Sequence, residues 1–361
     1  MMLQDASKRA KPPPKRTAAE WADDHLPLPP GSSQSRYRSS RTPYVKHVAA
    51  AMANPLYEGM TFITASQMGK TQIILAIIGQ RIDDDPVPII YLGPTRNNVD
   101  TVIEPKLQHM LENVPSLDKD LVKGKKAQKL AKRCKGVVIR LAWAGSATEV
   151  AAQNAGLGLA DEVDRMEDIP GEGDPLRALR KRTESYPGGK TAVTTTPTLG
   201  TVDTYIHETT GMEHWRVADN THVYSRSWLE WQIGTRHEWA TPCLGCGEYF
   251  VARFRHIHCK IDEGDALTQA ESARLCCPRC GHEHDDKAVI QIGQQAQPVA
   301  PGQWVEDGEV KGEPPRSKTY SLWVSGLFSP NNTLSGRMYD WITAKESEKS
   351  GQMQVEMNTC L

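Results

Sequence analysis

A phosphate-loop pattern at residues 64–71 constrains the fold of this chain more than any other feature. The segment reads Thr64-Ala-Ser-Gln-Met-Gly-Lys-Thr71, which matches G-x-x-x-x-G-K-[ST] except that threonine stands at the first glycine position. The apolar residues 60–63 before it and 72–78 after it predict the strand and the buried helix that flank such a loop. The motif therefore predicts the strand, loop and helix unit of an α/β domain that holds phosphate groups.

The residues of the loop have separate expected roles. Successive backbone N–H groups surround the phosphates, Lys70 meets the outer phosphates as a point charge, and the hydroxyl of Thr71 is a ligand for Mg²⁺. Gly69 lets the backbone approach closely. The expected contacts to ATP and Mg²⁺ within the loop are Ser66, Gln67, Met68, Gly69, Lys70 and Thr71.

An acidic pair, Asp161-Glu162, follows the apolar residues 156–160. A carboxylate at the end of a buried strand can hold Mg²⁺, and a neighbouring glutamate can orient and deprotonate an attacking water. The ordinary alternative for an isolated Asp-Glu pair is a solvated turn. Because a phosphate loop precedes the pair, we expect Asp161 to hold the Mg²⁺ shell and Glu162 to be the catalytic base.

Further apolar runs predict a parallel sheet with both faces covered. Residues 86–92, 137–143 and 191–195 read as strands, and apolar positions between residues 45 and 52 lie on one face of a helix. Strands separated by crossover helices favour parallel order. We therefore expect an α/β fold with a mainly parallel central sheet.

The charge of the chain is uneven. The formal net charge is −1 over 361 residues, a length sufficient for two domains. One stretch nevertheless carries seven basic residues and no acidic one, namely Lys123, Lys125, Lys126, Lys129, Lys132, Arg133 and Lys135. A solvated helix or loop and a contact with nucleic-acid phosphates are both open interpretations of this run. No apolar run reaches the ~18 residues of a membrane span, and the N-terminus lacks the apolar core of a secretion signal, so we expect an intracellular protein.

Two Cys-x-x-Cys-Gly knuckles predict a metal site. They are Cys243-Leu-Gly-Cys246 and Cys277-Pro-Arg-Cys280, and a β-hairpin between them would accommodate their separation of about thirty residues. We expect the four thiolates to bind one structural Zn²⁺, with no open position for water. Free or disulfide-bonded thiols are the alternative. Competing ligands nearby are Cys259, Cys276, His256, His258, His282 and His284.

Changes in amino-acid composition along the chain predict four parts. Residues 1–36 are rich in proline, serine and basic residues, and we expect them to be largely disordered apart from a short helix near residues 18–24. A nucleotide-binding domain would span residues 37–225 and a zinc-ribbon-like module residues 226–300. Residues 301–361 would form a return segment and a linker.

Taken in order, these motifs resemble one family, the large terminase subunit of lambda-like tailed phages (the GpA type), which packages DNA. The resemblance covers nearly the whole chain beyond the N-terminal tail, and no single motif decides it. The matching segments are Arg41-Thr-Pro-Tyr44, Ala65-Ser-Gln-Met-Gly-Lys-Thr71, Asp83-Asp-Asp-Pro86, Gly93-Pro-Thr95, Asp161-Glu-Val-Asp-Arg165, Gly173-Asp-Pro175, Thr195-Thr-Pro-Thr198, both knuckles, Gly302-Gln-Trp304 and Ser325-Gly-Leu-Phe-Ser-Pro330.

The resemblance implies a P-loop NTPase of the ASCE type that couples Mg²⁺-dependent ATP hydrolysis to the movement of double-stranded DNA into a procapsid. The location implied is the host cytoplasm, and the cofactors are ATP, Mg²⁺ and structural Zn²⁺. The implied partners are double-stranded DNA, a portal protein, a small terminase subunit bound through the N-terminal tail, and like subunits in a ring.

The resemblance also implies roles for residues outside the phosphate loop. Tyr44 and Arg41 match the region that contacts adenine, although a tyrosine of this kind is more often a core residue. Thr195, Thr196 and Thr198 match a coupling motif that senses the γ-phosphate or its water. A strand-ending turn, which Thr-Pro favours, is the ordinary alternative for that motif.

Two departures from the family pattern matter. Many packaging ATPases carry an arginine finger inside the loop, where this chain has Ser66 and Gln67, so the finger must come from elsewhere. Arg177, Arg180 and Arg182 could supply it from a neighbouring subunit, and solvated helix positions are the ordinary alternative for these arginines. Full-length relatives continue into a nuclease domain that would only be starting where this sequence ends, so we expect ATP hydrolysis without DNA cleavage. A helicase-like ATPase and a zinc-bearing scaffold that binds DNA or the small terminase are the alternative functions.

Overall fold

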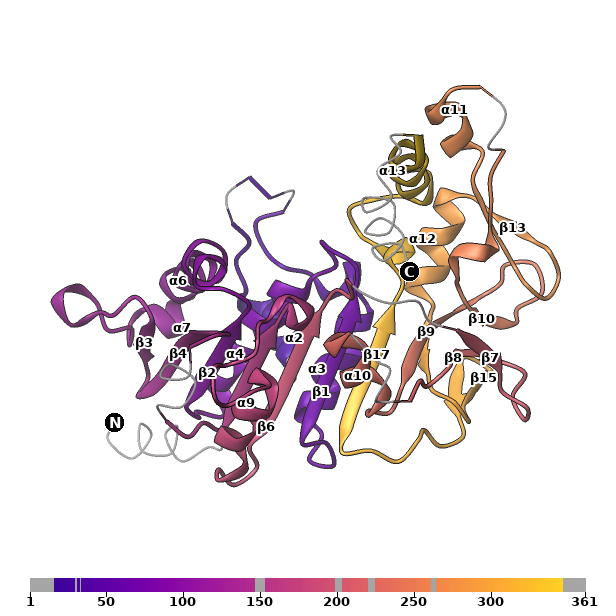
Figure 1. Ribbon diagram of the computed structural model, residues 1–361. Coiled ribbons are helices and arrows are strands. Elements are labelled where there is room, and N and C mark those ends of the chain that lie inside the picture. Colours follow the sequence, from indigo (N-terminus) through magenta and orange to yellow (C-terminus); the bar gives the residue numbers. More distant parts are fainter. Residues whose placement is uncertain are drawn as a thin grey trace, which may run out of the picture.

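A ten-stranded, mainly parallel sheet forms the centre of the molecule (Figure 1). The computed structural model describes residues 16–29, 31–32, 34–146, 153–198, 203–219, 225–260 and 264–346. The strand order is β10-β9-β17-β1-β6-β5-β2-β4-β3, and β14 pairs with β9. The strands are β1 (Gly59–Thr64), β2 (Ile89–Gly93), β3 (Ala131–Cys134), β4 (Val137–Trp143), β5 (Leu157–Asp161), β6 (Lys190–Thr195), β9 (His237–Pro242), β10 (Tyr249–Val251), β14 (Gln297–Val299) and β17 (Thr319–Val324).

The seven strands from β9 to β4 in this order run parallel, and β3, β10 and β14 are antiparallel edge strands. Strand β6 lies between β1, which leads into the phosphate loop, and β5, which ends in the acidic pair. The expected strands at residues 60–63, 86–92, 137–143 and 191–195 are confirmed. Parallel order brings the carboxyl ends of β1, β5 and β6 to one edge of the sheet.

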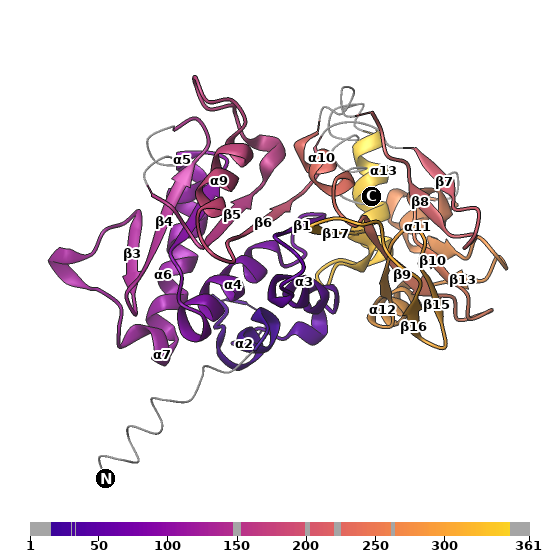
Figure 2. The ribbon, with the colours of Figure 1, turned by 90° about the horizontal axis from the view of Figure 1, so that it is seen from below.

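Helices cover both faces of the sheet (Figures 1 and 2). One face shares an apolar core with α2 (Ala18–His25), α3 (Tyr44–Ala53), α4 (Lys70–Asp84), α6 (Glu104–Asn113) and α7 (Pro115–Asp118). The other face is covered by α9 (Pro175–Glu184) and α10 (Arg226–Gln232). Helix α5 (Arg96–Asn98) and a π-helical turn (Val99–Ile103) lead into α6. No helix within the described ranges is long and apolar enough to cross a membrane.

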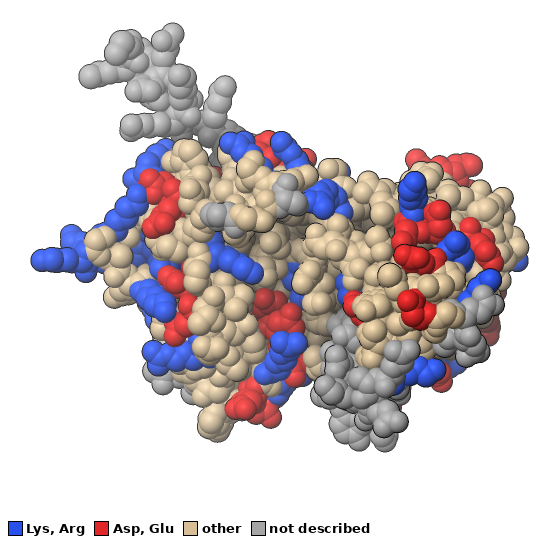
Figure 3. Space-filling model, turned by 90° about the horizontal axis from the view of Figure 1, so that it is seen from above, with Lys and Arg blue, Asp and Glu red and all other residues tan. Residues whose placement is uncertain are grey.

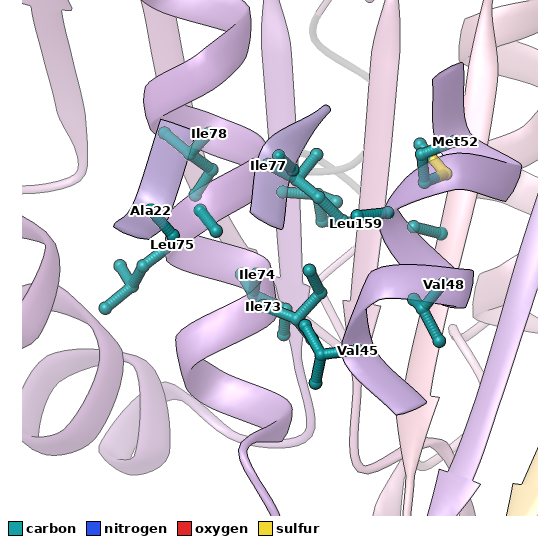
Figure 4. Close-up of a cluster of buried hydrophobic side chains, with 14 of the residues drawn as sticks. Ala22, Val45, Val48, Met52, Ile73, Ile74, Leu75, Ile77, Ile78 and Leu159 are labelled. Atoms are coloured by element: carbon teal, nitrogen blue, oxygen red, sulfur yellow. The ribbon is translucent and has the colours of Figure 1, made fainter. Parts of the chain in front are cut away.

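Helix α4 is buried on most of its circumference, because its interior consists of isoleucine, leucine, alanine and glycine. Its side chains pack between α2, α3 and the sheet (Figure 4). Trp21 of α2 is fully buried against Gly79, where an added Cβ would come within 2.0 Å of the indole ring. The indole ring of Trp21 thus packs into an apolar site on α4 and holds α2 against the domain. The composition of the tail does not indicate this contact.

The cysteine-bearing region contributes strands β9, β10 and β14 to the main sheet. Strand β17 pairs in parallel with β1 on one side and β9 on the other, so the sheet crosses both expected boundaries. Around it lie a small sheet of β11 (Ile257–His258), β12 (Arg274–Cys276) and β13 (Glu283–His284), two hairpins and three helices. The hairpins are β7 (Thr204–Ile206) with β8 (Glu213–Trp215) and β15 (Trp304–Glu306) with β16 (Glu309–Lys311), and the helices are α11 (Ala266–Glu271), α12 (Asp286–Gln294) and α13 (Leu334–Glu346).

Candidate active site

The phosphate loop lies at the carboxyl end of β1 and opens directly into α4, which begins at Lys70. Gln67 and Gly69 adopt left-handed backbone conformations, with φ of 59° and 86°, so the chain turns back tightly before the helix. The unpaired N–H groups of the first turn of a helix favour an anion. A pocket of about 470 Å³ at this point is lined by Ser66, Gln67, Gly69, Lys70, Thr71, Glu162 and Arg41 among other residues.

Thr64 needs no glycine at its position in the loop. Its backbone does not adopt a positive φ, and its hydroxyl lies 3.0 Å from both the carbonyl oxygen of Val324 and the sulfur of Met68. Both Thr64 and Met68 are buried. The threonine therefore ties the start of the loop to β17, and the side chain of Met68 faces the core.

The ammonium group of Lys70 is held among oxygen atoms. It donates hydrogen bonds to the carbonyl oxygen of Ala65 at 2.8 Å and to Oγ1 of Thr196 at 2.6 Å, and Oε1 of Glu162 lies 3.6 Å away. Burial lowers the pKa of Lys70, and the charges of Glu162 and Asp161 oppose that shift. Phosphate oxygens are ligands that could replace these contacts.

Asp161 is a buried carboxylate at the end of β5. Its Oδ1 accepts a hydrogen bond from Oγ1 of Thr194 at 2.7 Å, and its Oδ2 lies 3.5 Å from the hydroxyl of Tyr91. Burial, followed by the charge of Glu162, raises the pKa of Asp161 to about 6. A carboxylate is a ligand type that Mg²⁺ prefers.

Glu162 is turned out of the strand direction. Its backbone is left-handed, with φ 55° and ψ 52°, which for a residue other than glycine costs about 1–3 kcal/mol and is typical of functional sites. Its N–H still donates to the carbonyl oxygen of Thr194 at 2.9 Å. Its Oε2 is buried and has no hydrogen-bond partner among the described residues.

The three expected coupling threonines have different surroundings. Thr196 contacts Lys70 directly. Thr195 is fully buried and bonds to a serine hydroxyl of α10 at 2.8 Å, and the N–H of Thr198 donates to Asp164 at 3.0 Å. Only Thr196 therefore joins the phosphate-binding group, and the other two fasten the end of β6 to neighbouring elements.

Tyr44 lies beneath the loop, and it lines a neighbouring pocket with Arg41 and Asn331 and not the pocket that contains Lys70. It is 1% exposed, its ring packs edge-on against Trp239, and its hydroxyl donates to the carbonyl oxygen of Met68 at 3.2 Å. This geometry gives Tyr44 the core position that was the ordinary alternative to stacking on adenine. Arg41 lines the pocket and donates to the carbonyl oxygen of Pro330 at 3.3 Å.

Several residues of the site carry no motif in the sequence. Thr194 and Tyr91 contact Asp161, and Arg38, Lys106 and Asn331 line the pocket. The position of Thr194, one residue before the expected coupling motif, was a signal that could have been used. The others come from distant segments and depend on the fold.

Arg180, one expected source of an arginine finger, is engaged elsewhere in its own chain. It forms a two-pronged ion pair with Glu230, with one contact of 3.0 Å. It lines a pocket with Gly59 and Thr191, at the amino ends of β1 and β6, which is the sheet edge opposite Lys70. Arg177 is exposed on the same helix, α9.

The four knuckle cysteines converge on one point. The sulfur atoms of Cys243, Cys246, Cys277 and Cys280 all lie within 4.8 Å of one another, and no second such group occurs among the described residues. Two sulfur–sulfur distances are 3.6 and 3.9 Å, close to the ~3.8 Å edge of a tetrahedron with Zn–S bonds of ~2.3 Å. The backbone N–H groups of Gly245 and Arg279 donate to the sulfurs of Cys243 and Cys277 at 3.3 and 3.4 Å. The group fits a tetrahedral zinc ion.

The group of four contains none of the competing ligands, and two of these are engaged in other hydrogen bonds. Nδ1 of His284 bonds to the carbonyl oxygen of Leu275, and its Nε2 accepts from the N–H of Leu244 at 3.2 Å. Cys259 contacts the carbonyl oxygen of Gln269 at 2.8 Å. His284 therefore supports the first knuckle from behind and is no ligand itself.

A phosphate loop between β1 and α4, an acidic pair after β5 and an intervening β6 define a P-loop NTPase domain. Residues 31–304 match the family described as phage terminase large subunit gpA, ATPase domain. The chain belongs to this family.

Known relatives agree with this assignment in sequence. The chain is 22% identical over 358 residues to the terminase large subunit of Enterobacteria phage P21, covering 96% of this chain and 52% of the relative. The chain thus spans about half the length of the curated relative that it matches.

Two solved structures are also similar. The large terminase of bacteriophage HK97 has a TM-score of 0.41 at 15% identity, over 51% of this chain and 38% of that chain. The large terminase ATPase domain of Thermus phage P74-26 has a TM-score of 0.40 at 9% identity, over 86% of this chain and 91% of that chain.

Proposed function

We propose that this chain hydrolyses ATP in the presence of Mg²⁺ and that hydrolysis drives the movement of double-stranded DNA. The observation that carries the proposal is the convergence of Lys70, Asp161 and Glu162 at one edge of the sheet. Lys70 Nζ lies 3.6 Å from Glu162 Oε1, and Asp161 ends the strand that precedes Glu162. A portal protein, a small terminase subunit and further copies of this chain are the proposed partners.

The proposed chemistry assigns one task to each side chain. Lys70 and the loop N–H groups bind the outer phosphates, and Thr71 with Asp161 would hold Mg²⁺, which neutralises charge on the phosphates. Glu162 orients the attacking water and accepts its proton. The pocket supplies positioning and fixed charges, which carry most of the catalysis in phosphoryl transfer.

Thr196 is proposed to report the state of the nucleotide. The ammonium group of Lys70 donates to the hydroxyl of Thr196 at 2.6 Å and also to a carbonyl oxygen of the loop. A phosphate that draws the ammonium group away therefore breaks the hydrogen bond to Thr196. Strand β6 then carries the change to α10 through Thr195. The coupling motif would therefore act through one exchange of hydrogen-bond partners at Lys70, from Thr196 to a phosphate.

The cysteine group is proposed to bind one structural Zn²⁺. Four thiolates leave no coordination position for water, so the ion would organise the fold and perform no chemistry. Cys243 and Cys277 belong to the apolar core formed with α12 and α13, whereas Cys246 and Cys280 are exposed. Loss of the metal is therefore expected to loosen this core.

The ATPase proposal is tested by turnover of purified protein with and without Mg²⁺. Lys70→Ala and Glu162→Ala should each lower turnover by about 10²–10⁴-fold, the range for a general base and for a charged group at the reacting phosphate. The matched controls Lys46→Ala and Glu172→Ala, both at exposed positions, should retain activity. Equal background turnover by the wild type and all variants would refute the ATPase and leave the scaffold alternative.

The zinc proposal is tested by metal analysis of protein purified without chelators. We expect about one zinc per chain in the wild type and loss of the metal in Cys277→Ser. Cys276→Ser is the matched control, because the adjacent Cys276 is not part of the group. Absence of zinc from the wild type, or equal zinc in both variants, would refute the site.

A further inference from the structure

We propose that the basic arm, residues 121–135, is a surface that grips double-stranded DNA through its phosphates. The inference rests on the proposed function of this chain, since it names the contact through which ATP hydrolysis would act on DNA. It commits to DNA and not to an acidic protein as the occupant of the arm.

The basic arm projects beyond the edge of the central sheet. Its base is a short ladder, in which β3 pairs with β4, Leu121 pairs with Cys134, and the N–H of Val122 donates to the carbonyl oxygen of Arg133 at 2.9 Å. Residues 122–129 are all exposed. Figures 1 and 2 show this extension at the end of the molecule that carries β3. Such an extension contributes little apolar burial, so contact with another molecule gives it a role that packing does not.

Four of the seven cations in the arm are paired and three are not. Lys123, Lys129, Lys132 and Lys135 pair with Asp118, Asp100, Glu104 and Asp83 respectively. Lys125, Lys126 and Arg133 are exposed and have no ion pair among the described residues. The arm thus keeps three uncompensated positive charges, and Figure 3 shows basic side chains at the projecting tip.

Two of the three unpaired cations line one hollow. A space of about 190 Å³ between the arm and α6 is lined by Lys126 and Arg133, together with Lys123, Lys132, Gln108 and Glu112. Four of these side chains are cationic and one is acidic, so an anion is favoured there. A phosphate group of a DNA strand suits this charge, and the exposed Lys125 extends the contact along the tip.

The arm is fastened to the helix that reaches the nucleotide pocket. Lys132 bonds to Glu104 at 2.6 Å, and both side chains are nearly buried, at 10% and 13% exposed. Two residues further along α6, Lys106 lines the pocket that contains Lys70. A shift of α6 on nucleotide binding would therefore move the arm with it. This connection favours DNA, the moving cargo, over a static protein contact.

The test compares two triple variants of the full chain. Lys125→Ala, Lys126→Ala and Arg133→Ala together remove the unpaired charges of the arm. Lys46→Ala, Lys287→Ala and Arg316→Ala remove the same charge from exposed positions elsewhere. Binding of a fluorescent duplex of about 30 base pairs is measured across a salt series, because each phosphate contact contributes about 0.9 to the slope of log K against log salt.

In the arm variant the slope of log K against log salt should be smaller in magnitude by about 1 to 3 units, and the affinity for the duplex at about 0.1 M salt should fall at least roughly eightfold. The control variant should match the wild type. A triple variant that keeps the charges, with Lys125→Arg, Lys126→Arg and Arg133→Lys together, should retain binding. Basal ATP turnover should be equal in all proteins, whereas stimulation of turnover by the duplex should be lost only with the arm charges.

An arm variant that binds the duplex as the control does would overturn the inference, as would a wild type that does not bind DNA. Unchanged DNA binding with lost self-association would assign the arm to a contact between subunits instead. Absence of basal turnover in the wild type would refute the ATPase proposal separately, because the binding measurement needs no ATP.

Discussion

Replacement of Thr194 by valine tests how the site keeps Asp161 ionised. The substitution keeps the shape of the side chain and removes the hydroxyl that donates to Asp161 at 2.7 Å. Both residues are buried, so no water would readily take the place of the hydroxyl. We expect the variant to fold and to retain the phosphate loop, because Thr194 contacts neither the loop nor α4 through a hydrogen bond in the described structure.

The expected magnitude follows from the charge of the acceptor. A hydrogen bond to an ionised group contributes about 1.5–3 kcal/mol, which equals about 1–2 pKa units. The bond favours the carboxylate, so its loss raises the pKa of Asp161 from about 6 to about 7–8. At pH 7 the ionised fraction would fall from about nine tenths to between about one half and one tenth.

The assay is ATP turnover at subsaturating Mg²⁺ between pH 6 and pH 9, for the wild type, Thr194→Val and Thr194→Ser. The rise of activity with pH should lie about 1–2 units higher in the valine variant and recover near pH 9, because the carboxylate is then ionised in both proteins. The serine variant keeps the donor and should follow the wild type. A valine variant that loses the same factor at every pH would refute the reasoning.

Three further results are expected from the same geometry. Tyr44→Phe should lower the free energy of unfolding by about 0.5–1.5 kcal/mol, since it removes the bond to Met68, and should leave the KM for ATP unchanged; a large rise in KM would restore a direct role in binding the base. Trp21→Ala should cost about 3–5 kcal/mol in urea unfolding, whereas the control Trp304→Ala, 39% exposed, should cost much less. Asp161→Asn in Mg²⁺-free buffer should stabilise the protein by roughly 2–3 kcal/mol above pH 6 and not at pH 4. The pKa of Asp161 is about 6 in the folded wild type and about 3.9 in the unfolded chain, so the wild type loses stability as the pH rises between these values. A stability difference that does not depend on pH in chemical denaturation would contradict this.

Local sequence patterns predicted the elements that carry the site. The segments 60–63 and 137–143 are short apolar runs, and they form β1 and β4. The acidic pair was placed at a strand end because apolar residues 156–160 precede it. These inferences succeed because each depends on neighbours within a few residues.

Other features could not be predicted because they depend on pairing across long stretches of chain. Trp21 becomes a core residue only because Gly79 leaves room for its ring. Strand β17 enters the sheet beside β1, more than 250 residues away in the sequence. Thr194 acquires its role only when β6 lies next to β5.

The path from β17 shows why the cysteine group and the nucleotide pocket belong to one structural unit. After β17 the chain returns to the phosphate loop, where Asn331 Nδ2 donates to the carbonyl oxygen of Gln67 at 3.1 Å. Three residues later α13 begins, and its Leu334 packs in the same apolar core as Cys243. Gln67 adopts a left-handed backbone conformation, so a change in that conformation would displace the carbonyl oxygen that Asn331 holds. A rigid apolar core around Cys243 would then move together with Asn331, whereas a loosened core would deform instead. A contact transmits displacement only between parts that keep their shape.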